Sequence, residues 1–268
     1  MLTFLTIFAL CALLGSLVGF LAGLLGIGGG LLIVPVLSAL LKWFHIVHDD
    51  KVMLVAIATS LATILFTSTS SALAHHKNDN IPWHVAPWIM GGVAVGALGS
   101  GFMAAFLPAD IVRLVFGASV LLIAYRMLFA KVKLDEVIHA PNRWLLSTIT
   151  ALMGALSAMI GIGGGALIVP LLTYFSIDMK KAIGCASACG IVIALFGSIG
   201  YISSGWHAFE LESGFIGFIY LPALFGVVST SWFIAPIGAK ATQHLPVRTI
   251  KRVFAALLVI IALRMLMS

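Results

Sequence analysis

Charged residues are scarce in this chain of 268 residues. Asp, Glu, Lys and Arg make up 9% of the sequence, whereas a typical soluble domain contains roughly 25%. Hydrophobic residues make up 62%, and the mean hydropathy is +1.17. The alternation of period two that marks an outer-membrane barrel is missing, and the apolar runs are too long for barrel strands. This composition excludes a soluble globular protein and predicts an all-α polytopic membrane protein embedded in the lipid bilayer.

Cysteine is also scarce. The three cysteines, Cys11, Cys185 and Cys189, lie within apolar runs. Cys185 and Cys189 stand four residues apart on one helical face, which suits neither a disulfide framework nor a zinc site. We interpret them as small residues that pack between helices, and we predict no cofactor and no metal. The formal net charge of +6 does not indicate nucleic-acid binding, because the basic residues flank apolar spans and set orientation.

Acidic residues are missing from the interior of every predicted span. All nine acids and all eight histidines lie in loops or at the edges of spans. An intramembrane carboxylate usually marks a proton relay or a cation site, so this pattern argues against a cation carrier. The adjacent His75 and His76 could bind a metal, but we interpret the polar segment 75–80 as a solvated turn. No nucleophile and base are arranged for catalysis, so the sequence does not indicate an enzyme.

Glycine, by contrast, is abundant and repeated. The stretch GIGGGLLIVP at 26–35 returns 135 residues later as GIGGGALIVP at 161–170, with nine of ten positions identical. Such a match across half the chain indicates a duplicated unit. Four glycines in five residues disfavour a helix, so each copy predicts an interruption inside the membrane. Backbone that is not helical survives in lipid only where protein covers it or where it lines a pathway.

The two halves follow the same plan. The predicted spans are 2–25, 31–44, 52–74, 84–107 and 111–129 in the first half, and 144–160, 166–176, 182–204, 214–238 and 250–267 in the second. We therefore predict a first transmembrane repeat at 1–130, a cytoplasmic linker at 131–143 and a second repeat at 144–268. Each repeat is a broken or re-entrant hairpin plus three transmembrane helices, about 8–10 membrane segments in all. Gly15, Gly19 and Gly23 predict a face that allows close helix packing.

Basic loops predict the orientation. The segments 131–143 and 240–252 are strongly basic and are placed in the cytoplasm, whereas 205–213 has no Lys or Arg and is placed outside. Eleven of the fifteen Lys and Arg residues then lie on the cytoplasmic side, and both termini are extracytoplasmic. The first hairpin opens outward and the second inward. This predicts two inverted repeats, an arrangement associated with alternating access.

The predicted substrate site lies at the two glycine breaks, since paired breaks in matching positions mark the site of many transporters. Backbone N–H groups, hydroxyls and a thiol offer donors without formal charge, and helix N-termini favour a small anion. Such donors also suit polar neutral solutes. The candidate substrate-binding residues come from the breaks, the prolines after them and the next span of each half: Gly26, Gly28, Gly29, Gly30, Pro35, Thr59, Ser60, Gly161, Gly163, Gly164, Gly165, Pro170, Cys185 and Ser187.

Structural interpretations of the same residues stay open. The glycines could serve tight packing alone, the two prolines could only kink their helices, and Thr59 and Ser60 could bond to their own helix. A phosphate-binding loop of a nucleotide-binding fold is excluded, because no Gly-Lys-Ser/Thr follows the glycines and no strand precedes them.

The duplicated glycine motif, Ala58-Thr59-Ser60 and the closing Arg-Met-Leu triplets at 126–128 and 264–266 resemble the sulfite exporter TauE/SafE family. This family is also called the toluene sulfonate uptake permease family, and the resemblance covers the whole chain. It implies a bacterial or archaeal inner-membrane permease that moves sulfite, sulfonates or related sulfur-containing anions, often outward, with protons as the coupling ion. The chain departs from the family pattern at Gly184-Cys185-Ala186, where a Thr-Ser pair is usual.

The function expected from the sequence is therefore a secondary transporter, an exporter of small sulfur-containing anions. The alternatives are a permease or channel for another small anion, a neutral solute or a metal ion. A membrane scaffold is a third hypothesis that no sequence feature favours. The sequence leaves open whether the protein is a monomer or a homodimer.

Overall fold

The structure, a computed structural model, describes residues 2–26, 28–129, 142–209 and 214–241, with short helical stretches at 255–256, 258–260 and 262–263. Its elements are α1 (Leu2–Leu25), α2 (Gly30–Trp43), α3 (Asp49–Lys77), α4 (Ala86–Ala105), α5 (Ala109–Phe129), α6 (Arg143–Met159), α7 (Gly165–Tyr174), α8 (Met179–Ser204), β1 (Phe215–Ile216), β2 (Ile219–Tyr220) and α9 (Leu221–Ala241). Among the described helices, α1, α3, α4, α8 and α9 are long and apolar enough to cross a membrane. The prediction of an all-α polytopic membrane protein is confirmed.

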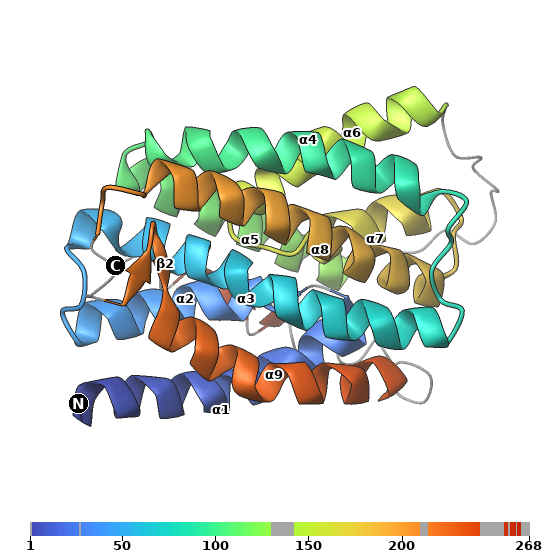
Figure 1. Cartoon of the computed structure of the whole chain (residues 1–268). Coiled ribbons are helices and arrows are strands. Elements are labelled where there is room, and N and C mark those ends of the chain that lie inside the picture. Colours follow the sequence, from blue (N-terminus) through green and yellow to red (C-terminus); the bar gives the residue numbers. More distant parts are fainter. Residues whose placement is uncertain are drawn as a thin grey trace.

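The centre of the bundle is formed by α3 and α8 (Figure 1). In their most apolar windows 83% and 72% of the residues are buried inside the protein, against 39% to 44% for α1, α4 and α9. The two central helices run in opposite directions, since Ser71 of α3 faces Ser187 of α8 while Leu61 faces Gly197. One helix from each half therefore builds the core of the protein.

Two further helix pairs flank this centre, and each pair joins the two halves of the chain. Helix α1 lies along α9, and α4 lies along α6. A Cβ added at Gly15, Gly19 or Gly23 would overlap with the backbone of α9, against Val227 at one end of the contact and Ala235 at the other. The small-residue face predicted from the fourfold glycine spacing is confirmed as a close helix contact.

The connections gather at the two ends of the bundle (Figure 1). The loop 44–48, the loop 106–108 and the β1–β2 hairpin lie at one end, and the loops 78–85 and 175–178 lie at the other. Counting the predicted spans back from the basic segment 131–143 puts 42–51 and 107–113 on one side of the membrane and 75–83 on the other, which is the same grouping.

The short arms of the two hairpins are helical but do not span a bilayer by themselves. Helix α2 has 14 residues and α7 has 10, which gives roughly 21 Å and 15 Å at 1.5 Å per residue. A hydrocarbon core is about 30 Å thick. Both arms end in the same way, with a left-handed residue after the last turn, His45 (φ 50°) and Ser176 (φ 58°). The backbone N–H groups of these residues and of those that follow bond back into the last turn.

The structure corrects two predicted boundaries. Helix α3 continues to Lys77, so His75 and His76 are helical and do not belong to a loop. The span predicted at 214–238 begins only at Leu221, because the preceding residues form the antiparallel β1–β2 hairpin. Four predicted features lie wholly or largely outside the described residues: the linker 131–143, the basic loop 240–252, the closing span 250–267 and the triplet 264–266. The loop 205–213 lies partly outside them.

Candidate functional site

Both glycine stretches interrupt the helix, as predicted. Gly29 precedes α2 with φ 83° and ψ −8°, and Gly164 precedes α7 with φ 75° and ψ −24°. This left-handed conformation is costly for any residue with a Cβ. Gly26 and Gly161, also 135 residues apart, share φ values of 67° and 68°. The duplicated sequence thus adopts a duplicated backbone.

The two breaks lie against each other, and all their described glycines are buried. A Cβ on Gly28 would lie 3.0 Å from the Cα of Gly163, and a Cβ on Gly30 would overlap with the carbonyl oxygen of Gly161. Only glycine leaves room for this approach of two backbones. The structure therefore brings together, from opposite halves, most of the predicted glycine residues.

Hydroxyl groups of α3 bond to both breaks. Ser60 Oγ donates to the carbonyl oxygen of Gly161 at 2.9 Å, and Thr67 Oγ1 lies 3.2 Å from the carbonyl oxygen of Gly28. Both side chains are buried. The alternative in which Ser60 bonds to its own helix is wrong, since its acceptor lies 101 residues away. Two carbonyl groups freed by the breaks are therefore stabilised by one central helix.

One hydroxyl at this point has no protein partner. Ser68 is 1% exposed, and its Oγ makes no hydrogen bond with any described residue. It lies 3.3 Å from where a Cβ of Gly28 would stand and 2.6 Å from that of Gly190 on α8. The fully enclosed hydroxyls without a partner in the described part of the chain are those of Ser157, Ser198 and Ser231, so the unbonded Ser68 Oγ keeps a small accessible surface. Ser68 is therefore available to a ligand at the meeting point of both breaks.

Backbone donors are available at the same place. The first intrahelical bonds of α2 and α7 are those of Leu32 and Leu167, to the carbonyl oxygens of Gly29 and Gly164. Among the described residues, no acceptor is found for the backbone N–H groups of residues 30 and 31 in α2 and of residues 165 and 166 in α7. Free N–H groups and the positive end of the helix dipole favour an anion at such a terminus. The arrangement offers two helix N-termini and one hydroxyl.

Three predicted binding residues lie elsewhere or have another role. Thr59 Oγ1 accepts a hydrogen bond from the backbone N–H of Tyr220 at 2.9 Å, so it anchors β2. Ser187 bonds to the carbonyl oxygen of Ile183 in its own helix and lies 3.1 Å from Ser71. Cys185 is buried and makes no described hydrogen bond to either break.

The prolines stay inside their helices. The carbonyl oxygens of Pro35 and Pro170 accept hydrogen bonds from Ser38 Oγ and Thr173 Oγ1, again 135 residues apart. Each proline also removes the hydrogen bond to the carbonyl four residues before it. Pro35 is buried and Pro170 is half-buried. Their described contacts are those of helix-shaping residues.

The sequence analysis missed Thr67, Ser68 and Gly190 as residues of this site. The signal was present, because Ser60, Thr67, Ser68 and Ser71 follow the helical period and share one face of α3. What the period does not give is the partner of that face, which depends on how α3 packs against the breaks.

The interpretation of His75 and His76 as a solvated turn is wrong for His75. This side chain is fully buried, and its Nε2 lies 3.1 Å from the carbonyl oxygen of Gly23 in α1. The polar segment looked like a loop because it lies at the end of an apolar span, whereas α3 continues through it. His76 is exposed, as predicted.

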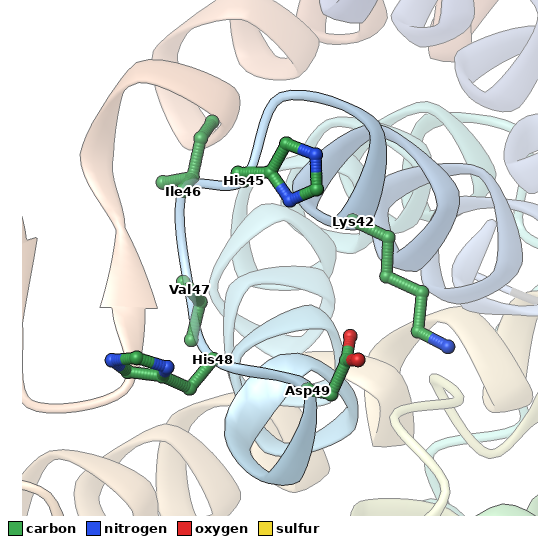
Figure 2. Close-up of a pocket in the computed structure, with 6 residues that line it drawn as sticks. All are labelled: Lys42, His45, Ile46, Val47, His48 and Asp49. Atoms are coloured by element: carbon green, nitrogen blue, oxygen red, sulfur yellow. The ribbon is translucent and has the colours of Figure 1, made fainter.

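A separate cleft of about 550 Å³ lies at the loop between α2 and α3 (Figure 2). Its lining residues are Lys42, His45, Ile46, Val47, His48 and Asp49. None of them belongs to a glycine break. No group of three or more His, Cys, Asp or Glu side chains that could hold a metal ion occurs among the described residues.

The fold is that of a polytopic helical membrane protein whose core contains two broken helices, one from each half. A family model, sulfite exporter TauE/SafE, matches residues 11–265. The chain belongs to this family and is a membrane transporter.

Relatives extend over nearly the full length. A probable membrane transporter protein of Haemophilus influenzae is 40% identical and covers 98% of this chain and 99% of its own. One of Methanocaldococcus jannaschii is 27% identical, covering 98% and 97%. YdhB of Bacillus subtilis, also a probable membrane transporter protein, is 29% identical, covering 86% and 88%. No solved structure matches this chain.

Proposed function

We propose that this protein is a secondary transporter that exports small sulfur-containing anions, such as sulfite or organosulfonates, across the cell inner membrane. The substrate binds where the two glycine breaks meet. The observation that carries this proposal is the set of unpaired donors there, the N–H groups at the starts of α2 and α7 and the hydroxyl of Ser68.

The charge of the core supports an anion as substrate. Among the described residues no Asp, Glu, Lys or Arg side chain is buried. Donors without formal charge can replace the water around a small anion without holding it too tightly to leave. A cation would need carbonyl or carboxylate ligands, and the carbonyl oxygens of Gly28 and Gly161 already accept bonds from Thr67 and Ser60.

Alternating access follows from the way the halves are related. In our proposal the two repeats are inverted, with 131–143 cytoplasmic and both termini extracytoplasmic. Three contacts support this. The central helices α3 and α8 are antiparallel, and the parallel pair α1–α9 has its counterpart in the parallel pair α6–α4. Rocking one half against the other would open the breaks to each side in turn.

A flux panel in proteoliposomes tests the substrate. Sulfite, sulfoacetate, sulfate and a neutral amino acid are compared with and without a pH gradient. Preferential transport of sulfite or sulfoacetate supports the proposal. Selective transport of the neutral solute, or no transport of any sulfur anion, would overturn it. The same panel separates the alternatives, a permease for another anion or for a neutral solute.

Glycine substitutions test where the substrate binds. In Gly29→Ala the new Cβ would overlap with Val18, and in Gly164→Ala it would lie 2.5 Å from Ile193 Cδ1, both at left-handed residues. We expect both variants to insert into the membrane and to lose transport. Gly99→Ala in α4 is the matched control, because a Cβ there meets nothing within 4 Å. Unchanged flux in the two break variants would place the substrate elsewhere.

A further inference from the structure

His75 differs from every other Asp, Glu, Lys, Arg and His residue that the structure describes, because it alone is buried. A group that can ionise within a membrane protein is costly to bury and usually has a function. Nothing in the anion site described above uses this side chain. Its position and contacts therefore need a separate explanation.

The ring of His75 connects three elements. Its Nε2 donates to the carbonyl oxygen of Gly23, in the last turn of α1 just before the first break. Carbonyl groups there have no partner within their helix. Its Nδ1 lies 3.5 Å from Nδ2 of Asn80, in the loop after α3. The backbone carbonyl of Asn80 packs so closely on Gly184 of α8 that a Cβ there would overlap with it.

This geometry uses a neutral ring. One ring nitrogen carries the hydrogen that bonds to Gly23, and the other presents a lone pair to the amide N–H of Asn80. An imidazolium would carry a hydrogen on both nitrogens, so the amide N–H of Asn80 could no longer face Nδ1. With the Asn80 amide in this orientation, the contact with the loop requires the neutral ring.

In the second half of the chain, a tyrosine of α8 makes the equivalent contact with the helix that precedes the break. Tyr201 follows His75 by 126 residues, the offset that aligns Ala56 of α3 with Ala182 of α8. Its hydroxyl donates to the carbonyl oxygen of Met159 at 3.4 Å, at the end of α6 just before the second break. An ordinary tyrosine has a pKa of about 10 and an ordinary histidine one of about 6.5. Only the histidine contact can respond to pH near neutrality.

Among the residues that the structure describes, no charged side chain competes for His75. Helix α1 contains no Asp, Glu, Lys, Arg or His. The described charged groups and histidines on α3, α8, α9 and the loop 78–85 near this end are all exposed: His76, Lys77, Asp79, His84, Asp178, Lys180, Lys181 and Lys240. The buried titratable groups of α8 near this end are the thiols of Cys185 and Cys189. The ring therefore interacts with carbonyl and amide groups rather than with a neighbouring carboxylate.

We propose that His75 is a proton-binding site of the transport cycle and that its protonation opens the contact between α1, the loop 78–85 and α8. This inference rests on the proposed transport function. When the contact opens, Nδ1 takes a proton from water and the ring becomes an imidazolium. When the ring is buried again, the Nδ1–H bond breaks and the proton returns to water. The equivalent contact at Tyr201 opens without a proton. Protons are thereby linked to opening at one end of the protein only.

His75→Gln tests the link in proteoliposomes, because glutamine keeps an N–H donor for Gly23 but does not titrate. The comparison variant is His76→Gln, at the exposed neighbour, whose Nδ1 accepts a hydrogen bond from Trp83 Nε1 of the same loop at 3.3 Å, so it tests whether the other histidine contact of the loop contributes. We expect all forms to exchange sulfite across the membrane at equal pH. A pH gradient should drive accumulation in the wild type and in His76→Gln and have no effect in His75→Gln. A full response of His75→Gln, or no response of the wild type, would overturn the inference while sulfite exchange still supported the proposed function.

A second measurement does not depend on the substrate. Cys185 follows Gly184, so its labelling by N-ethylmaleimide reports whether the loop 78–85 has moved away from α8. The other cysteines are replaced, Cys11→Ala and Cys189→Ala. Labelling is compared at about pH 5.5 and about pH 8, on either side of the ordinary histidine pKa. At the lower pH, Cys185 should be labelled faster in the protein that keeps His75 than in the His75→Gln variant, both of them lacking the other two cysteines. Identical pH profiles would overturn the inference even if no anion were transported.

Discussion

Removing single hydroxyl groups from α3 separates substrate binding from structural support. Ser68 Oγ has no partner among the described residues, so Ser68→Ala removes no hydrogen bond within the protein. We expect the free energy of unfolding to fall by less than about 0.5 kcal/mol, the lower end of what one hydrogen bond contributes. If Ser68 donates to the bound anion, the variant loses about 1.5–3 kcal/mol of binding free energy. That loss corresponds to an affinity about 10- to 150-fold weaker.

Ser60→Ala should show the opposite pattern, a loss of stability rather than a loss of substrate affinity. Ser60 holds the carbonyl oxygen of Gly161, and its removal leaves a buried acceptor without a donor. The expected cost is about 1–3 kcal/mol of stability, with a smaller effect on affinity. Thr69→Ala is the control, because this half-buried hydroxyl bonds only to the carbonyl of Leu65 in its own helix.

The assay combines thermal unfolding of the purified protein with the concentration dependence of sulfite uptake in proteoliposomes. The expected pattern is weaker uptake affinity with unchanged stability for Ser68→Ala, and reduced stability for Ser60→Ala. Wild-type affinity in Ser68→Ala would refute the assignment of this hydroxyl to the substrate. Equal losses of stability in both variants would show that Ser68 has a structural partner after all.

Three further substitutions test the packing that positions the site. Gly96→Ala should destabilise the protein by about 1–3 kcal/mol, since the new Cβ would overlap with the α6 backbone; an unchanged melting temperature would argue against the α4–α6 contact. Thr59→Val removes the acceptor of the Tyr220 N–H, and hydrogen exchange at that amide should accelerate, whereas continued protection would mean another acceptor. His45→Gly should raise the stability by about 1 kcal/mol, because the exposed His45 adopts a left-handed φ of 50°; a lower melting temperature would contradict this.

Much of the fold could be predicted from the sequence, because lipid permits few backbone conformations. A long run of apolar residues predicts a transmembrane helix. The glycine motif at 26–30 and 161–165 predicts that the helix is interrupted there, since glycine both disfavours a helix and permits a left-handed backbone. The structure has both breaks at those positions. The spacing of Gly15, Gly19 and Gly23 likewise predicted a helix contact, without identifying α9 as the partner.

The site itself was only partly predictable, because hydroxyl groups look alike in a sequence. Thr59 and Ser60 are neighbours on α3, yet one anchors the backbone of Tyr220 and the other the carbonyl of Gly161. Adjacent residues of a helix point about 100° apart, so each meets a different partner. Ser68, eight residues further along, shares the face of Ser60 and reaches the breaks.

The sequence by itself determined the class of protein, the duplication and the places where the helices break, because each follows from local composition and from the cost of unpaired backbone in lipid. Only the tertiary structure decided that Ser68 makes no hydrogen bond within the described part of the chain and that His75 is buried. Ser68 and His75 obtain those properties from α1, α8 and the two breaks. These elements are far away in the chain, and they come together only when the two halves pack around the α3–α8 pair.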